Sequence, residues 1–224
     1  STHNWTNRSP LRHRLFFMAL ALACFAFSSR AQAVSPAPDG GYANGNTAEG
    51  TNALFSRTGG GSNTAVGSQS LYHVTTGSQN TATGYQTLFS NTTGGKSTAY
   101  GSQALYYNTI GDFNVATGYR TLYSNTTGSE NTGDGYAALV LNTTGEDNTA
   151  NGFKALYNNR TGIDNTASGS EALFINRTGS DNTANGFQAL YANTAGYINT
   201  AIGNQALYNQ SGDADTMASG HSAL

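Results

Sequence analysis

The residues that come closest to a chemical site are acidic side chains repeated at multiples of seventeen positions. They are Glu130, Asp147, Asp164, Asp181 and Asp215. If these positions stack about 4.8 Å apart, as neighbouring strands do, their like charges repel and could recruit a hard cation such as calcium. The alternative is a set of solvated turns, in which nearby Arg160 and Arg177 form weak ion pairs. The sequence favours the solvated turns, because the Gly-Gly-x-Gly-x-Asp pattern of calcium-binding repeats is absent.

Catalytic groups do not cluster in this sequence. His73 and His221 are the only histidines after residue 45, and both occupy positions that vary between copies of the repeat described below. A solvated surface histidine is therefore favoured over a metal ligand or a general base. The only cysteine, Cys24, lies near the N-terminus, away from both histidines. Neither a Cys–His nor a Ser–His–Asp arrangement can be assembled from these residues. We expect no catalytic residues, no cofactor and no metal, and hence a protein that is not an enzyme.

The acidic residues and both histidines belong to a seventeen-residue unit that recurs without insertion from Asn46 to Leu224. Its pattern is Asn-Thr-Ala-x-Gly-x-x-Ala-Leu-Tyr-x-Asn-Thr-Thr-Gly-x-x, and its places are numbered 1 to 17 from an asparagine such as Asn148. Place 9 is always leucine: Leu54, Leu71, Leu88, Leu105, Leu122, Leu139, Leu156, Leu173, Leu190, Leu207 and Leu224. Place 5 is always glycine, as at Gly84, Gly118, Gly152 and Gly186. A fixed short period of this kind is the signature of a repeat architecture.

Composition and charge exclude several classes of partner. Charged residues are only 10 % of the chain and the formal net charge is −2, so there is no electrostatic case for binding nucleic acid or an anionic membrane. Low charge with abundant Thr, Asn and Gly is also typical of disorder. The unbroken column of leucines argues against disorder, because a disordered segment has no need to hold a bulky apolar residue in phase.

The N-terminus has the three-part layout of a secretory signal peptide. Basic residues around Arg12 precede the apolar run from Leu15 to Phe27, and Ala31-Gln32-Ala33 matches a cleavage site. The run of thirteen residues is short for a membrane span, so a retained anchor is the less favoured alternative, as is acylation of Cys24. We expect a signal peptide at 1–33, a Pro- and Gly-rich linker at 34–45, and the repeats at 46–224, with no transmembrane segment in the mature chain.

The pattern within one unit predicts an all-β fold. The apolar places lack a 3.6-residue spacing, which argues against a helical repeat. Ala at place 3 and the variable residue at place 4 alternate as in a strand, and a second strand is expected around Ala-Leu-Tyr. Glycines at places 5 and 15 are expected at corners that need positive φ. Each unit then forms one coil of a parallel β-solenoid, or β-roll, in which the asparagines at places 1 and 12 stack into hydrogen-bonding ladders.

Place 10 suggests how such a protein would assemble. It is aromatic in nine of ten copies, Val140 being the exception. If the leucines fill the coil interior, these rings point outward and form an apolar stripe longer than a monomer usually exposes. The candidate assembly or contact residues are Tyr72, Phe89, Tyr106, Tyr123, Tyr157, Phe174, Tyr191 and Tyr208. We expect a homo-oligomer, with a trimer as the simplest form. Aromatic residues at place 6, such as Tyr85 and Phe187, are better candidates for exposed contacts with a ligand.

The unit resembles repeats of secreted adhesins and fibres. It is similar in style to the YadA-type head β-roll of trimeric autotransporter adhesins, whose shorter unit also has an Ala-x-Gly core. It is closer to the seventeen-residue repeats of phage-type fibre proteins that often end in an intramolecular chaperone. The resemblance covers 46–224 and implies a trimeric rod. The anchor barrel, stalk and chaperone domain of these families are not found, and the chain stops within a unit, so we expect a fragment of a longer protein.

These observations predict a secreted or cell-surface protein, held at an outer membrane if a C-terminal anchor follows. Its expected role is a rigid adhesin head or fibre shaft that presents many weak contacts to a host-surface protein or glycan. Two alternatives remain open: a phage-derived tail-fibre segment, and an ice-binding solenoid. The second rests on the threonines of place 2, which are Thr47, Thr64, Thr81, Thr98, Thr132, Thr149, Thr166, Thr183 and Thr200.

Overall fold

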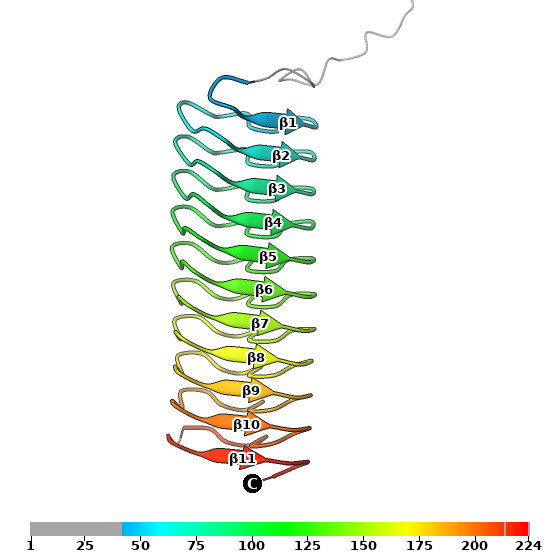
Figure 1. Cartoon of the computed structure of the whole chain (residues 1–224), viewed down its shortest axis with the longest axis vertical. Helices are drawn as coiled ribbons and strands as arrows, with labels where there is room; N and C mark the ends of the chain where they lie inside the picture. Colours follow the sequence, from blue (N-terminus) through cyan, green and yellow to red (C-terminus); the bar gives the residue numbers. More distant parts are fainter. Residues whose placement is uncertain (1–41, 213, 224) are drawn as a thin grey trace, which may run out of the picture. The chain divides into compact units, whose positions relative to one another are not determined.

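The computed structural model describes residues 42–212 and 214–223. The predicted signal peptide and most of the predicted linker lie outside these residues. Within them, the backbone forms eleven short strands that make one sheet in sequence order (Figure 1). The strands are β1 (Thr47–Glu49), β2 (Thr64–Val66), β3 (Thr81–Thr83), β4 (Thr98–Tyr100), β5 (Val115–Thr117), β6 (Thr132–Asp134), β7 (Thr149–Asn151), β8 (Thr166–Ser168), β9 (Thr183–Asn185), β10 (Thr200–Ile202) and β11 (Met217–Ser219). The predicted all-β parallel solenoid is confirmed.

Each strand pairs in parallel with the strand seventeen residues later. In the β7–β8 pair, Thr149 lies opposite Thr166, Ala150 opposite Ala167 and Asn151 opposite Ser168. The same offset holds from β1–β2 to β10–β11, so every residue lies next to its counterpart in the neighbouring coil. Coils are therefore numbered by their strands, and coil 6, for example, spans 131–147. Neighbouring coils are about 4.8 Å apart, as expected for paired strands.

The core of the stack consists of one leucine and two small residues from each coil. The place 9 leucines from Leu54 to Leu207 are all buried, with at most 4 % exposure. Ala at place 3 is buried in every strand that carries it, while places 2 and 4 on either side face outward. Place 8, usually alanine, is also buried, as at Ala155. Because the interior is so narrow, Leu and Ala fill it without any larger side chain.

The second strand expected around Ala-Leu-Tyr is not formed. The buried leucines have φ between 49° and 54°, in the left-handed region, and the segment is a series of turns. Places 7 and 17 are also left-handed, as at Lys154 (φ 54°) and Asp164 (φ 56°). Leucine tolerates this conformation here because the next coil satisfies its backbone: the Leu156 N–H donates to the Ala172 carbonyl at 2.9 Å. Stacking thus replaces the ladder of a regular strand.

Glycine is required at places 5 and 15 for different reasons. At place 5 the prediction is confirmed, since φ lies between 119° and 139°. At place 15 it is wrong, because those glycines do not have positive φ. A Cβ on Gly145 would lie 2.5 Å from the carbonyl oxygen of Gly162 and closer still to Oδ1 of Asn142. Place 15 is therefore glycine because the next coil and a buried asparagine leave no room for a methyl group.

Both predicted asparagine ladders are present and buried. At place 1, Nδ2 of Asn148 donates to Oδ1 of Asn131 at 3.0 Å and to the Gly162 carbonyl at 2.8 Å. At place 12, Nδ2 of Asn142 donates to Oδ1 of Asn125 at 2.8 Å and to the Gly145 carbonyl at 2.9 Å. Each amide thus joins two coils and closes a turn of its own coil. These bonds satisfy polar groups that would otherwise be costly to bury.

The last residues of the predicted linker continue the repeat toward the N-terminus. The Asn44 carbonyl accepts from the Ser62 N–H at 2.8 Å, as Gly61 does from Gln79 one coil later. Asn44 therefore occupies place 16 of a preceding turn, and Gly45, with φ of 69°, occupies place 17. Together with the antiparallel bridge between Tyr42 and Asn46, these residues cover the first coil.

Candidate functional site

The aromatic residues at place 10, here called the inner ring column, stack on one another along the coils. Ring centres are 4.9 to 5.2 Å apart from Phe55 to Tyr123 and again from Tyr157 to Tyr208. All the predicted contact residues from Tyr72 to Tyr208 are half-buried, whereas Phe55 at the first coil is 56 % exposed. The rings already cover much of each other's surface. The inner ring column thus exposes less apolar surface to a partner than the sequence indicated, and the trimer stays a prediction.

Burial within this column changes the acidity of its phenols. Burial raises the pKa of Tyr106, and the neighbouring Tyr107 and Tyr85 add to this. Burial also raises the pKa of Tyr123, helped by a hydrogen bond with Tyr107. At Tyr191 burial and the charge of Glu171 act in the same direction. The surroundings of Tyr106, Tyr123 and Tyr191 therefore favour the neutral form of these three phenols.

The most exposed regular aromatic surface is at place 6, here called the outer ring column. Its aromatic members are Tyr85, Tyr119, Tyr136, Phe153 and Phe187, with exposed fractions between 41 % and 50 %. Three of them are consecutive and stacked: ring centres are 5.3 Å apart for Tyr119–Tyr136 and 5.4 Å for Tyr136–Phe153. Elsewhere the place holds small polar residues such as Ser102. The outer ring column is therefore densest in coils 5 to 7.

Place 7, here called the polar column, forms a side-chain ladder that the sequence interpretation missed. Nε2 of Gln86 donates to Gln69 at 2.8 Å, and Nε of Arg120 donates to Gln103 at 2.9 Å. Toward the C-terminus, Gln188 donates to the Glu171 carboxylate at 2.7 Å. The run of glutamines at one place of the repeat was the available signal.

Lys154 and Glu171 stand at place 7 in neighbouring coils, a spacing that predicts an ion pair between coils and a parallel stack, but the ion pair is not formed. Glu171 accepts from Gln188, while Nζ of Lys154 lies 5.0 Å from the ring centre of Phe153. The same ammonium lies 5.6 Å from the ring centre of Tyr157. Lys154 thus interacts with aromatic rings of its own coil, and the parallel stacking rests on the strand pairing instead.

The acidic column at place 17 is solvent-exposed. Glu130, Asp147, Asp164 and Asp181 lie on successive coils and Asp215 lies further along. Within the described part of the chain, no group of three or more His, Cys, Asp or Glu side chains is arranged to hold a metal ion. Arg160 and Arg177 are exposed as well and form no ion pair with these carboxylates. The geometry thus agrees with solvated turns.

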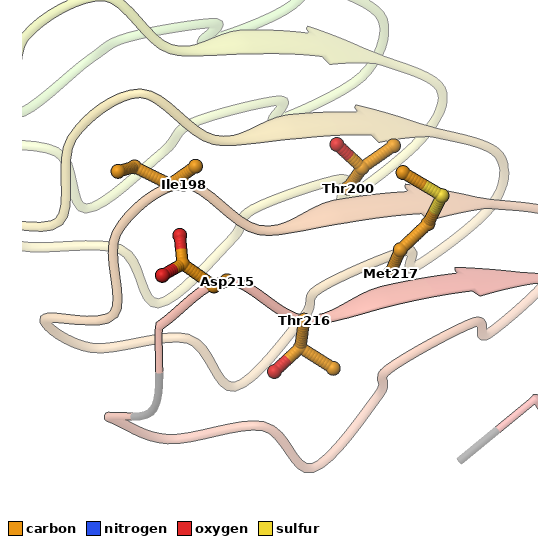
Figure 2. A pocket seen from close by; sticks show the side chains of 5 residues that line it. All are labelled: Ile198, Thr200, Asp215, Thr216 and Met217. Carbon is orange, nitrogen blue, oxygen red and sulfur yellow. The ribbon is translucent and has the colours of Figure 1, made fainter.

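A shallow depression lies beside the last two strands, with a volume of about 220 Å³. Figure 2 shows its lining: Ile198 and Asp215 face each other from successive turns, and Met217 extends toward Thr200, while Thr216 completes the set. Asp215 is the only ionisable group of the five, and the hydroxyls of Thr200 and Thr216 are the other polar side-chain groups of the lining.

The two histidines lie on the surface. His73 is exposed and its ring packs edge-on against Tyr72 and Phe89, with centre distances of 4.7 and 4.9 Å. His221, at the last coil, is also exposed. Neither lies beside a residue that would make it a metal ligand or a general base.

The strand face carries the predicted threonine row. The place 2 residues of β3 to β9, mostly threonine, are exposed, with Val115 and Met217 replacing Thr in β5 and β11. Place 4 on the same face is also outward but varied, from Glu49 to Tyr100 and Ile202. On this face the residues of place 2 are therefore nearly uniform, whereas those of place 4 differ from coil to coil.

No family model, no curated protein and no solved structure matches this chain. Residues 42–212 and 214–223 contain no helix that is long and apolar enough to cross a membrane. What the protein does must therefore be inferred from the columns of side chains themselves.

Proposed function

We propose that this protein is a non-enzymatic adhesive rod that presents columns of identical side chains to an extracellular partner. The observation that carries the proposal is the outer ring column, whose five aromatic residues repeat at the spacing of the coils and are 41 to 50 % exposed. A rigid array of equivalent groups gains avidity from many weak contacts, with no need for a deep pocket. The proposal includes secretion through the segment 1–33 and display at the cell surface, with a trimer as the expected assembly.

The stiffness required for this role has a clear physical basis. Backbone hydrogen bonds join each coil to the next, the buried asparagines of place 1 do so along most of the stack and those of place 12 from Asn91 to Asn193, and stacked rings add to them in most coils. Interiors of this kind are close-packed and resist deformation. Groups that are fixed relative to one another can engage an extended partner together without an additional entropic cost of ordering.

Adhesion of beads coated with the protein tests the proposal. Coated beads are expected to be retained on at least one immobilised extracellular glycan or matrix protein, and retention should fall stepwise as place 6 aromatics are replaced by serine. Serine occupies the same place at Ser68, Ser102 and Ser170, so these variants should keep their melting temperature. If no glycan, matrix protein or cell surface retains the coated beads above uncoated ones, the adhesive function is wrong.

A second candidate, binding to ice, is favoured by one observation. The threonines of place 2 lie opposite one another from strand to strand, in an exposed row with constant spacing. Thermal hysteresis of the purified protein, lost on replacing Thr149 and Thr166 by lysine, would support it. An absence of hysteresis in the unmodified protein would exclude it.

A further inference from the structure

The two columns next to the outer rings are interrupted in the same coil. Coil 6 has Ala137 at place 7 and Val140 at place 10, where coils 2 to 5 and 7 to 10 carry a long polar side chain and an aromatic ring. Both small residues are buried, at 4 % and 6 % exposure. Coil 6 nevertheless keeps its outer ring, Tyr136, which is 49 % exposed. The exposed ring of Tyr136 therefore lies beside Ala137, where the row of long polar side chains is interrupted.

The coils on either side of this interruption carry cations held against aromatic rings. The guanidinium carbon of Arg120 lies 4.7 Å from the ring centre of Tyr123 and 5.6 Å from that of Tyr119. Nζ of Lys154 lies 5.0 Å from the ring centre of Phe153 and 5.6 Å from that of Tyr157. Such contacts hold a cation in place without neutralising its charge.

Most of the hydrogen-bonding capacity of these cations is not used by the described part of the protein. Arg120 donates only through Nε, to Gln103. The Lys154 ammonium makes no hydrogen bond or ion pair there. Glu171, one coil beyond Lys154 in the polar column, accepts a hydrogen bond from Gln188. Coils 5 to 7 thus offer two fixed positive charges with free donors.

The spacing of these groups suits a linear polymer lying along the stack. The outer rings recur once per coil, about 4.8 Å apart, and the two cations are two coils apart, about 10 Å. An extended chain of linked pyranose rings advances by nearly one coil spacing per sugar. Tyrosine offers an apolar edge and a hydroxyl to such rings. The cations then coincide with every second sugar.

We propose that coils 5 to 7 bind an extended acidic polysaccharide that carries a carboxylate on alternate sugars. Its sugar rings lie along Tyr119, Tyr136 and Phe153, and successive carboxylates pair with Arg120 and Lys154. The inference rests on the adhesive function proposed above and names the class of ligand. Such a glycan carries one charge for every two sugars, which two cations can match, whereas a nucleic acid backbone or an anionic membrane presents charge at a higher density than two cations can neutralise.

Binding of the whole protein to a polysaccharide that alternates uronic acid with N-acetylhexosamine tests this inference. The matched ligand is the same polymer after reduction of its carboxyl groups to alcohols. We expect binding to the acidic form that weakens with added salt and a much weaker response to the reduced form. Vesicles with anionic lipid and double-stranded DNA are included, and preferential binding to either would overturn the assignment.

The repeat itself supplies variants that should fold normally. Arg120→Gln and Lys154→Gln introduce glutamine, which already occupies place 7 in other coils as Gln103 and Gln188. Each is expected to weaken binding about fivefold, and the double variant about 25-fold. The control is Lys96→Gln: Lys96 lies 4.6 Å over the Phe113 ring at place 17, where Gln79 stands in an earlier coil. It should bind like the unmodified protein.

The outcomes separate the ligand class from the adhesive function. Equal binding of the reduced polymer, or full binding by the double variant, would overturn the assignment to an acidic glycan. The same holds if the acidic polymer does not bind at all. If coated beads are still retained on another surface in that case, the adhesive function stands and only the ligand class proposed for coils 5 to 7 fails.

Discussion

Gly133 lies directly against Thr121: a Cβ built on Gly133 would be 2.5 Å from Cγ2 of that threonine. Gly133 is the one place 3 residue that is not alanine, and Thr121 stands at place 8 of the preceding coil, where alanine is usual. The Thr121 hydroxyl donates to the Gly135 carbonyl at 2.6 Å, which fixes its methyl group toward Gly133. A larger residue at one place is thus matched by a smaller one in the next coil.

The first prediction concerns this pair. Gly133→Ala should destabilise the protein by about 1 kcal/mol, near the lower limit for overpacking, because Thr87 and Ala99 occupy the same two places in an earlier pair of coils. In the Thr121→Ala background the same substitution should be neutral or stabilising. Urea unfolding of the four proteins gives the coupling energy. Equal effects of Gly133→Ala in both backgrounds would contradict the contact.

The second prediction concerns the place 12 ladder. Asn142→Ala should cost about 3 kcal/mol or more, because it removes bonds to Asn125 and Gly145 and takes from the buried Asn159 amide one of its two acceptors. Asn193→Ala is the matched control: its Oδ1 already lacks a partner, since the next coil carries Gln210. Its cost should be clearly smaller. Similar losses of melting temperature in the two variants would show that an asparagine inside the ladder stabilises the protein no more than one at its end.

The same burial predicts the fate of the Asn-x-Ser/Thr sequences in the repeats. Five of them begin at Asn91, Asn125, Asn142, Asn159 and Asn176, which have no exposed surface, whereas the sixth begins at the exposed Asn209. Within the repeats, folded protein offered to an oligosaccharyltransferase should therefore accept a glycan at Asn209 only, whereas denatured protein should accept glycans at the other five as well. Mass spectrometry distinguishes the two, and modification of any of the five in the folded form would contradict the burial of the ladder.

The fourth prediction concerns the crowding that requires glycine at place 15. Gly145→Ala should destabilise by about 3 kcal/mol or more, because the methyl group meets the Gly162 carbonyl and the Asn142 amide. Gly59→Ala, one place earlier in its own unit, meets nothing closer than Thr76 at 3.8 Å and should be nearly neutral. Thermal unfolding of both variants provides the test. A neutral effect of Gly145→Ala would show that neighbouring coils can separate.

The fifth prediction concerns alkaline pH. The folded pKa values of Tyr106 and Tyr123 lie above the ordinary value near 10, mainly because of burial. Their neutral forms therefore contribute stability that is fully present below about pH 10 and is lost as the pH rises through the folded pKa values. The Tyr106→Phe, Tyr123→Phe double variant, with the residue native at Phe89, should lose less melting temperature there. Identical pH profiles would contradict this assignment.

How much of this fold was predictable is clearest at place 9. The leucine period predicted the solenoid and the buried column correctly, because one bulky apolar residue per unit must fill a shared interior. Its backbone was not predicted: Leu156 has φ of 50°, a conformation that leucine rarely adopts alone. Only the neighbouring coil, through Ala172, makes it acceptable. A backbone conformation that only the neighbouring copy stabilises cannot be predicted from the pattern within one copy.

The surface shows the same limit. Exposed rings at place 6, such as Tyr85, could be predicted, because the residue at this place differs in size from copy to copy while its position in the unit is constant. The coincidence at coil 6, where Ala137 and Val140 interrupt two columns between Arg120 and Lys154, needs the side-chain positions. Likewise Lys154 and Glu171 are in the correct register to pair, yet each has a better partner.

The strict seventeen-residue offset between neighbouring strands has a consequence for how such proteins change length. Duplicating or excising one whole unit would join surfaces that already fit, because each strand meets only its predecessor and successor. Loss of a single residue would instead turn a buried leucine toward solvent in one place and disrupt every bond across that junction. Lineages carrying this architecture should therefore differ by entire modules, and the span of the rod becomes an adjustable trait.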